Sequence, residues 1–314
     1  MPPSYIVVNA ARTAEENIKR NLLKTQKLIK PYRVEHGKKF RLKDFDPADT
    51  QGLDLREEAG DLLKEGVERL SDIQQKLYAQ DRWALLLILQ AMDAAGKDSV
   101  IRHVMSGVNP QGCQVYAFKA PSAEDLSHDF LWRTSKCLPQ RGHIGIFNRS
   151  YYEEVLVVRI HQQLLAKERV PPSLVKKAIW KERFDDINSF ETHLEREGVL
   201  VRKFFLHVSK EEQKRRFLSR LEEPDKNWKF SEDDVRERER WEEYMSAYED
   251  MIRHTATPRA PWYVVPADHK WFTRLVVASA IIHTLESLNL SFPKVDSERK
   301  RKLESARRVL LSER

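Results

Sequence analysis

The residues best placed to do chemistry lie in a short turn between an apolar run and a helical pattern. Residues 85–89 are all apolar, a run too short to span a membrane and typical of a strand buried on both faces. The turn 91–96 follows, and Gly96-Lys97 opens a helical pattern. Strand, turn and helix in this order predict a phosphate site, where backbone N–H groups at the helix start and the lysine ammonium face the anion.

Two carboxylates in or beside this turn need an explanation. The turn departs from the pattern G-x-x-x-x-G-K-[ST], because Ala91 replaces the first glycine and Asp98 replaces the hydroxyl residue. Asp93 precedes Lys97 by four residues, so both can face one phosphate. Phosphate repels a carboxylate there unless the carboxylate holds Mg²⁺ or takes a proton, which favours a functional role for Asp93. For Asp98 a metal role and simple stabilisation by the helix dipole both remain open.

A second polar cluster follows the apolar strand predicted over 143–148. In an open α/β sheet, active-site residues gather at the end of such a strand. Arg149 can clamp a phosphate through two parallel hydrogen bonds. Glu153 can order metal-bound water or orient an acceptor, with a helix-start glutamate as the alternative. Asn148 carries no charge for a metal, so the prediction places the metal on Asp93.

A third cluster lies in a charge-dense helical region from 209 to about 255, which Pro224 interrupts. Arg216 and Arg220 share a helix face at i,i+4. An insertion of this kind between two strands is typical of a lid that closes over phosphates, and a solvated helix face is the alternative. The remaining candidate phosphate ligands are Lys226 and Lys229 in the same region, and Arg102, Lys119 and Arg133, which we expect to flank the turn.

The elements that must position these clusters alternate between strand and helix. Strands are predicted over 84–90, 114–119, 143–148, 201–208 and 262–265. The helical patterns between them are what a parallel sheet requires. We expect an α/β fold made of a basic N-terminal extension over 1–50, a kinase domain over 51–290 with the lid at about 209–255, and a charged helical tail over 291–314.

Charge and cysteine content narrow the class of protein. The 314 residues carry a net charge of +7, with eleven Lys/Arg against six Asp/Glu in 1–50 and seven against four in 295–314. The basic balance therefore comes from the ends and does not by itself identify a polyanion partner. Two cysteines cannot form a disulfide framework. No N-terminal stretch resembles a signal peptide, and no run approaches the roughly 20 apolar residues of a membrane span. We expect a cytoplasmic protein that does not enter a membrane.

Five stretches together resemble the polyphosphate kinase 2 family. They are 92–98 (MDAAGKD), 108–112 (VNPQG), 147–153 (FNRSYYE), 223–230 (EPDKNWKF) and 260–268 (APWYVVPAD), within a resemblance that covers about 38–290. It implies a P-loop three-layer α/β/α fold with a helical lid, similar to that of thymidylate kinases. It also implies an enzyme that uses Mg²⁺ and moves a phosphoryl group reversibly between inorganic polyphosphate and AMP or ADP.

The same resemblance assigns roles to the candidate residues. Asp93 becomes the carboxylate that activates the acceptor or organises the metal. Lys97 and Arg149 become phosphate ligands, and the lid arginines become clamps on the transition state. The sequence 152–155 (YEEV) resembles the branch that accepts AMP as well as ADP. The implied partners are polyphosphate and adenine nucleotides, with guanine nucleotides left open, and other copies of the chain in a dimer or tetramer.

Two alternatives belong to other functional classes. An ATP-dependent nucleoside monophosphate kinase shares the P-loop and the lid. A non-catalytic polyanion or nucleic-acid binder would use the basic ends, but the aromatic stripes that stack single-stranded bases are missing, so we expect no nucleic acid.

Overall fold

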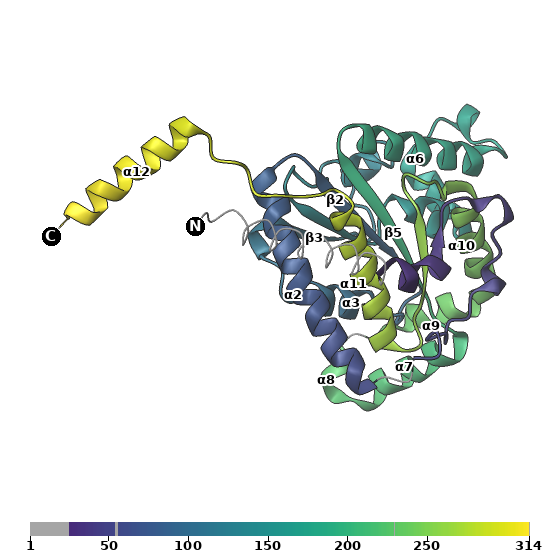
Figure 1. Ribbon diagram of the computed structural model, residues 1–314. Helices are drawn as coiled ribbons and strands as arrows, with labels where there is room; N and C mark the ends of the chain where they lie inside the picture. The colour runs from purple at the N-terminus through teal and green to yellow at the C-terminus, as the bar shows by residue number, and fades with distance from the viewer. Residues whose placement is uncertain (1–24, 54–55, 229, 314) are drawn as a thin grey trace.

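The computed structural model describes residues 25–53, 56–228 and 230–313. Its centre is a six-stranded sheet with the order β1-β6-β5-β2-β4-β3 (Figure 1). The strands are β1 (Arg33–Val34), β2 (Ala84–Gln90), β3 (Cys113–Ala117), β4 (Ile144–Asn148), β5 (Val199–His207) and β6 (Trp262–Pro266). All neighbours are parallel except β1, which runs antiparallel to β6. The predicted parallel sheet is confirmed.

Strand β2 occupies the middle of the sheet, between β5 and β4. Leu85 pairs with Ile144 on one side and with Leu200 on the other. Every residue of β2 is buried, because helices cover both faces of the sheet. This is why the strand reads as an unbroken apolar run and not as an alternating one.

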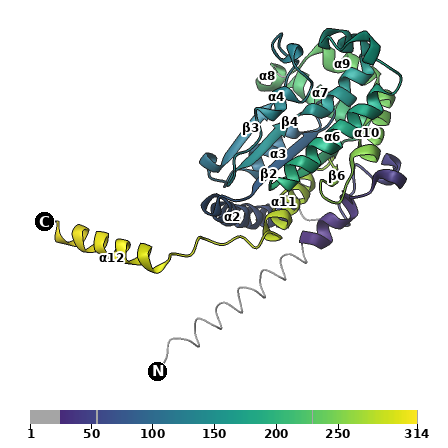
Figure 2. The same cartoon turned by 90° about the horizontal axis from the view of Figure 1, so that it is seen from above.

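Helices form a layer on each face of the sheet (Figure 2). One layer contains α2 (Arg56–Gln80), α3 (Lys97–Val104) and α11 (Lys270–Glu286), of which α11 contacts both of the others. The other contains α6 (Ile179–Arg196), α10 (Trp241–Thr255) and the 3-10 helix η6 (Tyr151–Val155). The predicted three-layer α/β/α arrangement is therefore confirmed.

The region predicted as a lid divides into two parts. It contains α7 (Lys210–Glu222), α8 (Pro224–Asn227), α9 (Glu232–Glu239) and α10. Tyr244, Tyr248 and Met251 of α10 are buried in the core. In α9 no residue is buried, so the part that stands outside the core ends before α10. Two further short helices, α4 (Trp132–Ser135) and α5 (Val157–Ile160), lie between β3 and α6 in the chain.

The two ends of the described chain differ in how they pack. At the N-terminal end, Ile29, Tyr32 and Phe40 are buried in the core, and β1 joins the sheet. The remainder of the predicted extension, residues 1–24, lies outside the described residues. At the C-terminal end, α12 (Ser297–Ser312) has no buried residue and stands apart from the body (Figures 1 and 2).

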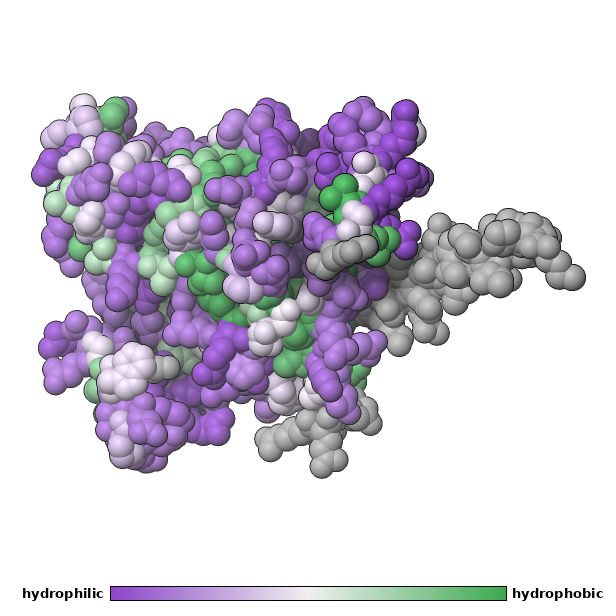
Figure 3. Space-filling model, turned by 90° about the vertical axis from the view of Figure 1, so that its left-hand side faces the viewer, coloured by the Kyte–Doolittle hydropathy of each residue, from purple (hydrophilic) through white to green (hydrophobic). Residues whose placement is uncertain are grey.

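The surface reflects the high charged fraction of 33%. On the face drawn in Figure 3, hydrophilic residues surround a smaller central apolar area. None of the helices in the described part of the chain combines the length and apolar character needed to cross a bilayer.

Candidate active site

The loop between β2 and α3, residues 91–96, wraps around the Lys97 ammonium. Lys97 Nζ donates to the carbonyl of Ala91 at 2.8 Å and to that of Met92 at 3.4 Å. Gly96 has φ of 110°, a conformation that suits glycine, whereas Ala94 adopts φ of 60° despite its side chain. Backbone strain of this kind concentrates at functional sites.

A chain of alternating charges links this loop to the end of β4. Asp93 Oδ1 lies 4.0 Å from Lys97 Nζ and accepts a hydrogen bond from Arg149 Nη2 at 2.6 Å. Arg149 Nη1 donates to Glu153 Oε2 at 3.2 Å. One guanidinium therefore bridges two carboxylates. The predicted site residues Lys97, Asp93, Arg149 and Glu153 form one continuous chain of ion pairs.

The electrostatics of this chain favour an ionised Asp93. Burial raises the pKa of the Asp93 carboxyl, but Lys97 and Arg149 together lower it further, and the net shift is downward. The Glu153 and Asp93 carboxylates raise the pKa of Arg149. Burial lowers the pKa of Lys97, against the attraction of Asp93. The cluster therefore places an ionised Asp93 carboxylate between two basic side chains beside the loop.

Arg149 itself has φ of 64°, a left-handed conformation that costs energy for a residue with a side chain. Its backbone N–H donates to the carbonyl of Leu89 at 3.1 Å, which ties the end of β4 to β2. Beside it, Asn148 Nδ2 donates to Asp98 Oδ1 at 2.6 Å. Asp98 is therefore anchored to β4 as well as lying in the first turn of α3.

Two pockets adjoin this chain of charges. The first, which we call the P-loop pocket, has a volume of about 280 Å³. It brings together most of the predicted phosphate ligands: Asp93, Gly96, Lys97, Asp98, Arg102, Arg216, Arg220 and Lys226. Lys270 and Ser219 also line it. The sequence reasoning missed Lys270, since it opens a helix far along the chain.

The second, which we call the side pocket, has a volume of about 350 Å³. Its charged lining includes Lys119, Arg133, Arg149 and Glu153, and its apolar lining includes Phe118, Pro121, Leu126 and Val157. Arg133 Nη1 donates to the Lys119 carbonyl at 2.8 Å, and its guanidinium lies 5.5 Å from the Phe118 ring centroid. Since Asp93 lines one pocket and Arg149 the other, their ion pair joins the two.

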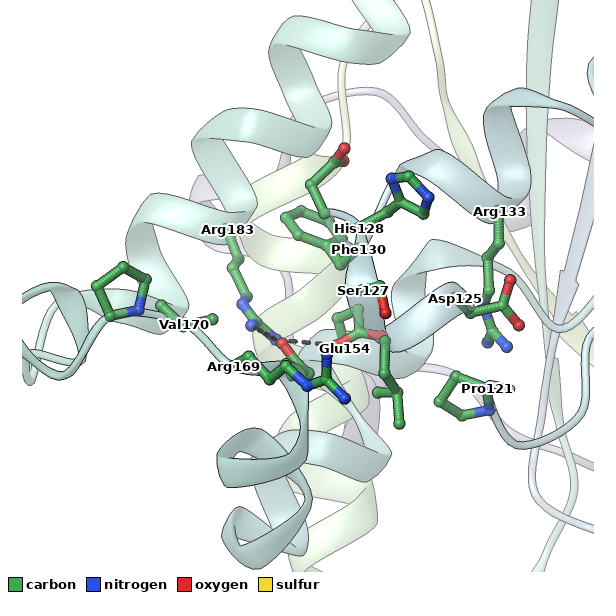
Figure 4. A pocket seen from close by; sticks show the side chains of 14 residues that line it. Pro121, Asp125, Ser127, His128, Phe130, Arg133, Glu154, Arg169, Val170 and Arg183 are labelled. Atoms are coloured by element: carbon green, nitrogen blue, oxygen red, sulfur yellow. Dashed lines mark hydrogen bonds and ion pairs between the residues drawn. The ribbon is translucent and has the colours of Figure 1, made fainter. Parts of the chain in front are cut away.

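A third pocket continues from the side pocket and shares Arg133, Glu154 and Glu168 with it. Figure 4 shows the Arg183 side chain, which lines this pocket, pointing toward Glu154. Arg183 Nη1 donates to Glu154 Oε2 at 2.9 Å, and Nη2 donates to Glu168. Burial and the nearby Glu168 carboxylate raise the pKa of Glu154 to about 8.

The candidate phosphate ligands of the lid differ in their partners and in their burial. Arg220 Nη1 lies 3.5 Å from Asp234 of α9, and Lys226 pairs with Glu223. Arg216 is buried, with 8% of its surface exposed. Lys229 lies outside the described residues.

The predicted metal site at Asp93 has few protein ligands around it. The described residues contain no group of three or more His, Cys, Asp or Glu side chains that could hold a metal ion. Mg²⁺, however, commonly binds through one or two carboxylates together with substrate phosphates and water. An ionised Asp93 in the wall of the P-loop pocket fits that pattern.

Comparison with known proteins agrees with this geometry. The family model described as polyphosphate kinase 2 matches residues 54–293. The chain is 52% identical over 283 residues to an ADP-polyphosphate phosphotransferase of Rhodopseudomonas palustris, covering 90% of this chain and 98% of the relative. It is 42% identical over 270 residues to an AMP/ADP-polyphosphate phosphotransferase of Meiothermus ruber, covering 86% and 97%.

Among solved structures, the polyphosphate kinase 2 of Arthrobacter aurescens superposes with a TM-score of 0.79 at 40% identity. The match covers 87% of this chain and 95% of that one. The predicted P-loop kinase fold and the prediction of an enzyme are both confirmed. The chain belongs to the polyphosphate kinase 2 family of phosphotransferases.

Proposed function

We propose that this enzyme transfers a phosphoryl group, reversibly, between inorganic polyphosphate and AMP or ADP. Family membership and the names of the two relatives support this reaction. The observation that carries it in the structure is the pair of adjoining pockets, joined by the 2.6 Å contact between Asp93 and Arg149. A transferase with two phosphorylated substrates needs two sites that meet at one point.

The linings of the two pockets favour different substrates. Polyphosphate is a linear anion, and the P-loop pocket gathers Lys97, Arg102, Arg220, Lys226 and Lys270. Such a concentration of cations focuses an attractive potential on a polyanion. The side pocket is less strongly cationic, because its basic residues lie beside Glu153, Glu154 and Glu168, and its apolar side chains suit a nucleoside. We therefore assign the nucleotide to the side pocket.

The residues between the pockets then acquire roles. Lys97 and Arg149 bind the transferring phosphoryl group and its neighbours. Asp93 orients the attacking phosphate oxygen and accepts its proton where one is present. Glu153 holds the second arm of the Arg149 guanidinium. These roles require positioning and charge stabilisation, which supply most of the catalysis in phosphoryl transfer.

We further propose that the enzyme uses Mg²⁺, with Asp93 and the substrate phosphates as its ligands. When bound, the ion neutralises charge that develops on the phosphate oxygens.

The reaction is tested by offering AMP and ADP separately with polyphosphate and no ATP, and by resolving the nucleotides by chromatography. We expect ADP and ATP to form, and omission of Mg²⁺ to prevent it. Conversion of AMP only when ATP is the donor would establish a nucleoside monophosphate kinase instead. Polyphosphate binding without turnover of either nucleotide would establish a binding protein. GMP and GDP in the same assay decide whether guanine nucleotides are acceptors.

We also propose that the chain forms a dimer or tetramer and acts in the cytoplasm. Helix α12 supports the first proposal, because Leu303, Leu310 and Leu311 are exposed on it. Light scattering on the full chain and on a chain ending at Asn289 tests it; we expect the shorter chain to have a smaller assembly mass per protomer. The free thiols of Cys113 and Cys137 support a reducing compartment, and fractionation of cells tests that location.

A further inference from the structure

The start of α7 is attached to the P-loop by side-chain hydrogen bonds. Gln213 Nε2 donates to the carbonyl of Asp93 at 2.9 Å. Arg216 Nη1 donates to the carbonyls of Ala94 at 3.1 Å and Ala95 at 2.7 Å. Three consecutive carbonyls of the loop are therefore held from one side by two side chains that lie one turn apart.

The other donors of Arg216 are also used. Nη2 donates to the carbonyls of Ala267 at 2.6 Å and Asp268 at 3.2 Å, in the loop between β6 and α11. Nε donates to Glu212 Oε1 at 2.6 Å. A guanidinium has five N–H donors in a fixed plane, and these contacts occupy all five. In this arrangement Arg216 has no donor left for a phosphate oxygen.

These contacts fix the direction of the loop's peptide groups. In a planar trans peptide, the C=O and the following N–H point in opposite directions. With the carbonyls of Asp93 and Ala95 held toward α7, the N–H groups of Ala94 and Gly96 point away from it. Backbone N–H groups of this kind are what a P-loop offers to phosphate.

The same contacts hold together the P-loop, the loop between β6 and α11, and the start of α7. Arg216 joins the P-loop to the β6–α11 loop, and Asp268 of that loop accepts a hydrogen bond from the backbone N–H of Ser209 at 2.8 Å. Ser209 caps α7 through its hydroxyl. The first half of α7 therefore belongs to the floor of the site, and any closing part of the lid begins after Arg216.

We propose that Arg216, assisted by Gln213, is a positioning residue that sets the P-loop backbone for phosphate binding, and not a clamp on the transferring phosphoryl group. Only the expected loss of turnover rests on the proposed function; the positioning of the P-loop backbone does not. The proposal replaces the transition-state role expected for Arg216 from the family resemblance, and leaves that role to Arg220.

The decisive variants are Arg216→Lys and Gln213→Met. Lysine keeps the positive charge but cannot reach two loops with a planar fork. Methionine keeps the length of Gln213 and removes its donor and all polarity. The matched control is Lys214→Arg, on the same helix, where the side chain is exposed.

The first readout is hydrogen–deuterium exchange of the segment 91–100 in the enzyme without substrates. We expect faster exchange in both decisive variants and no change in Lys214→Arg or Arg220→Ala. The second readout is turnover with whichever donor the wild type uses, which we expect to fall by about 10²-fold in Arg216→Lys, the usual cost of a misplaced reacting group.

Unchanged exchange together with near-normal turnover in Arg216→Lys would overturn the proposal, because only the charge of Arg216 would then matter. If Arg216→Lys fails to fold, Gln213→Met decides, since a neutral residue cannot act as a cationic clamp. Because exchange is measured without substrate, its result stands even if polyphosphate proves not to be the donor.

Discussion

The Arg149 guanidinium lines the side pocket and reaches Asp93 in the wall of the P-loop pocket. It pairs with Asp93 from the P-loop and with Glu153 from η6, and it does so from a left-handed backbone conformation. A strained backbone conformation that several contacts hold in place is typical of functional sites, where the position of the side chain is needed despite the cost to the stability of the protein. The geometry of the fork, and not only its charge, is therefore expected to be required.

Replacing Arg149 with lysine tests that expectation. A lysine ammonium is a point charge and cannot donate to both carboxylates in the planar geometry of a guanidinium. We expect turnover to fall by about 10²-fold, with the midpoint of thermal unfolding little changed. Arg141→Lys, at a side chain that is 52% exposed, serves as the control. Wild-type turnover in Arg149→Lys would show that charge alone is sufficient.

Among the individual site residues, those that lie close together in the sequence could be predicted from it. Asp93, Lys97 and Asp98 could be predicted because a strand, a turn and a helix place them together within a few residues. Gln213 and Lys270 could not, since Gln213 reaches the loop from α7 and Lys270 reaches the P-loop pocket from α11, both distant in sequence. Their chemistry depends on tertiary contacts that no local pattern contains.

Helix α7 shows how one element can serve two purposes. Its first half is bonded to the P-loop, while Arg220, one turn after Arg216, lines the P-loop pocket and pairs with Asp234 of α9. Burial and the Asp93 carboxylate raise the pKa of Asp234 to about 6, against the effect of Arg220. We therefore propose that the second half of α7, with α8 and α9, is the part that closes over substrate.

An Arg220→Ala variant should lose turnover and keep its fold. A lid arginine acting on a transferring phosphoryl group is worth about 10³–10⁵ in rate, so even partial involvement gives a fall of about tenfold or more. The unfolding midpoint should change little. The comparison variant is Arg236→Ala on α9, where the side chain is 71% exposed. Equal turnover in the two variants would reduce Arg220 to a solvated helix face.

The elements themselves were largely predictable, for a physical reason. Strands β2, β4, β5 and β6 are largely buried and rich in apolar residues, so each stands out between polar helical segments. The edge strand β3 has no buried residue, although the predicted range 114–119 overlaps it. Strand β1 has only two residues, too few for a pattern, and joins the sheet because Ile29 and Tyr32 pack against the core. Helix α10 was included in the lid because its charges dominate the sequence, whereas its buried face carries Tyr244, Tyr248 and Met251.

For the whole molecule, the Glu154–Arg183–Glu168 cluster links the site to stability. The pKa of Glu154 is raised from 4.5 to about 8, so between those pH values the folded state binds more protons than the unfolded state. The free energy of unfolding then falls as the pH rises through this window. Below about pH 4.5 the contribution is fully present, and above about pH 8 it is lost.

Glu154→Gln removes this titration while keeping an oxygen that can accept from Arg183. Between pH 5 and pH 8, we expect the unfolding midpoint of the variant to fall less than that of the wild type. A difference of only 1 kcal/mol corresponds to about 2–4 °C for a domain of this size, which calorimetry resolves. Parallel pH profiles for the two proteins would show that Glu154 is ionised throughout.

For the whole molecule, we propose that two phosphate-bearing substrates meet at Asp93, between the P-loop pocket and the side pocket. The most direct measurement is the initial rate of ATP formation from ADP with polyphosphate as the only donor, in the wild type and in Asp93→Asn. The substitution keeps the shape of the side chain and removes its charge. The account predicts a fall of at least about 10³-fold, in the range for loss of a positioned acid–base group, with polyphosphate binding and the unfolding midpoint retained and with no recovery in excess Mg²⁺. An Asp93→Asn enzyme that keeps most of the wild-type rate would contradict it.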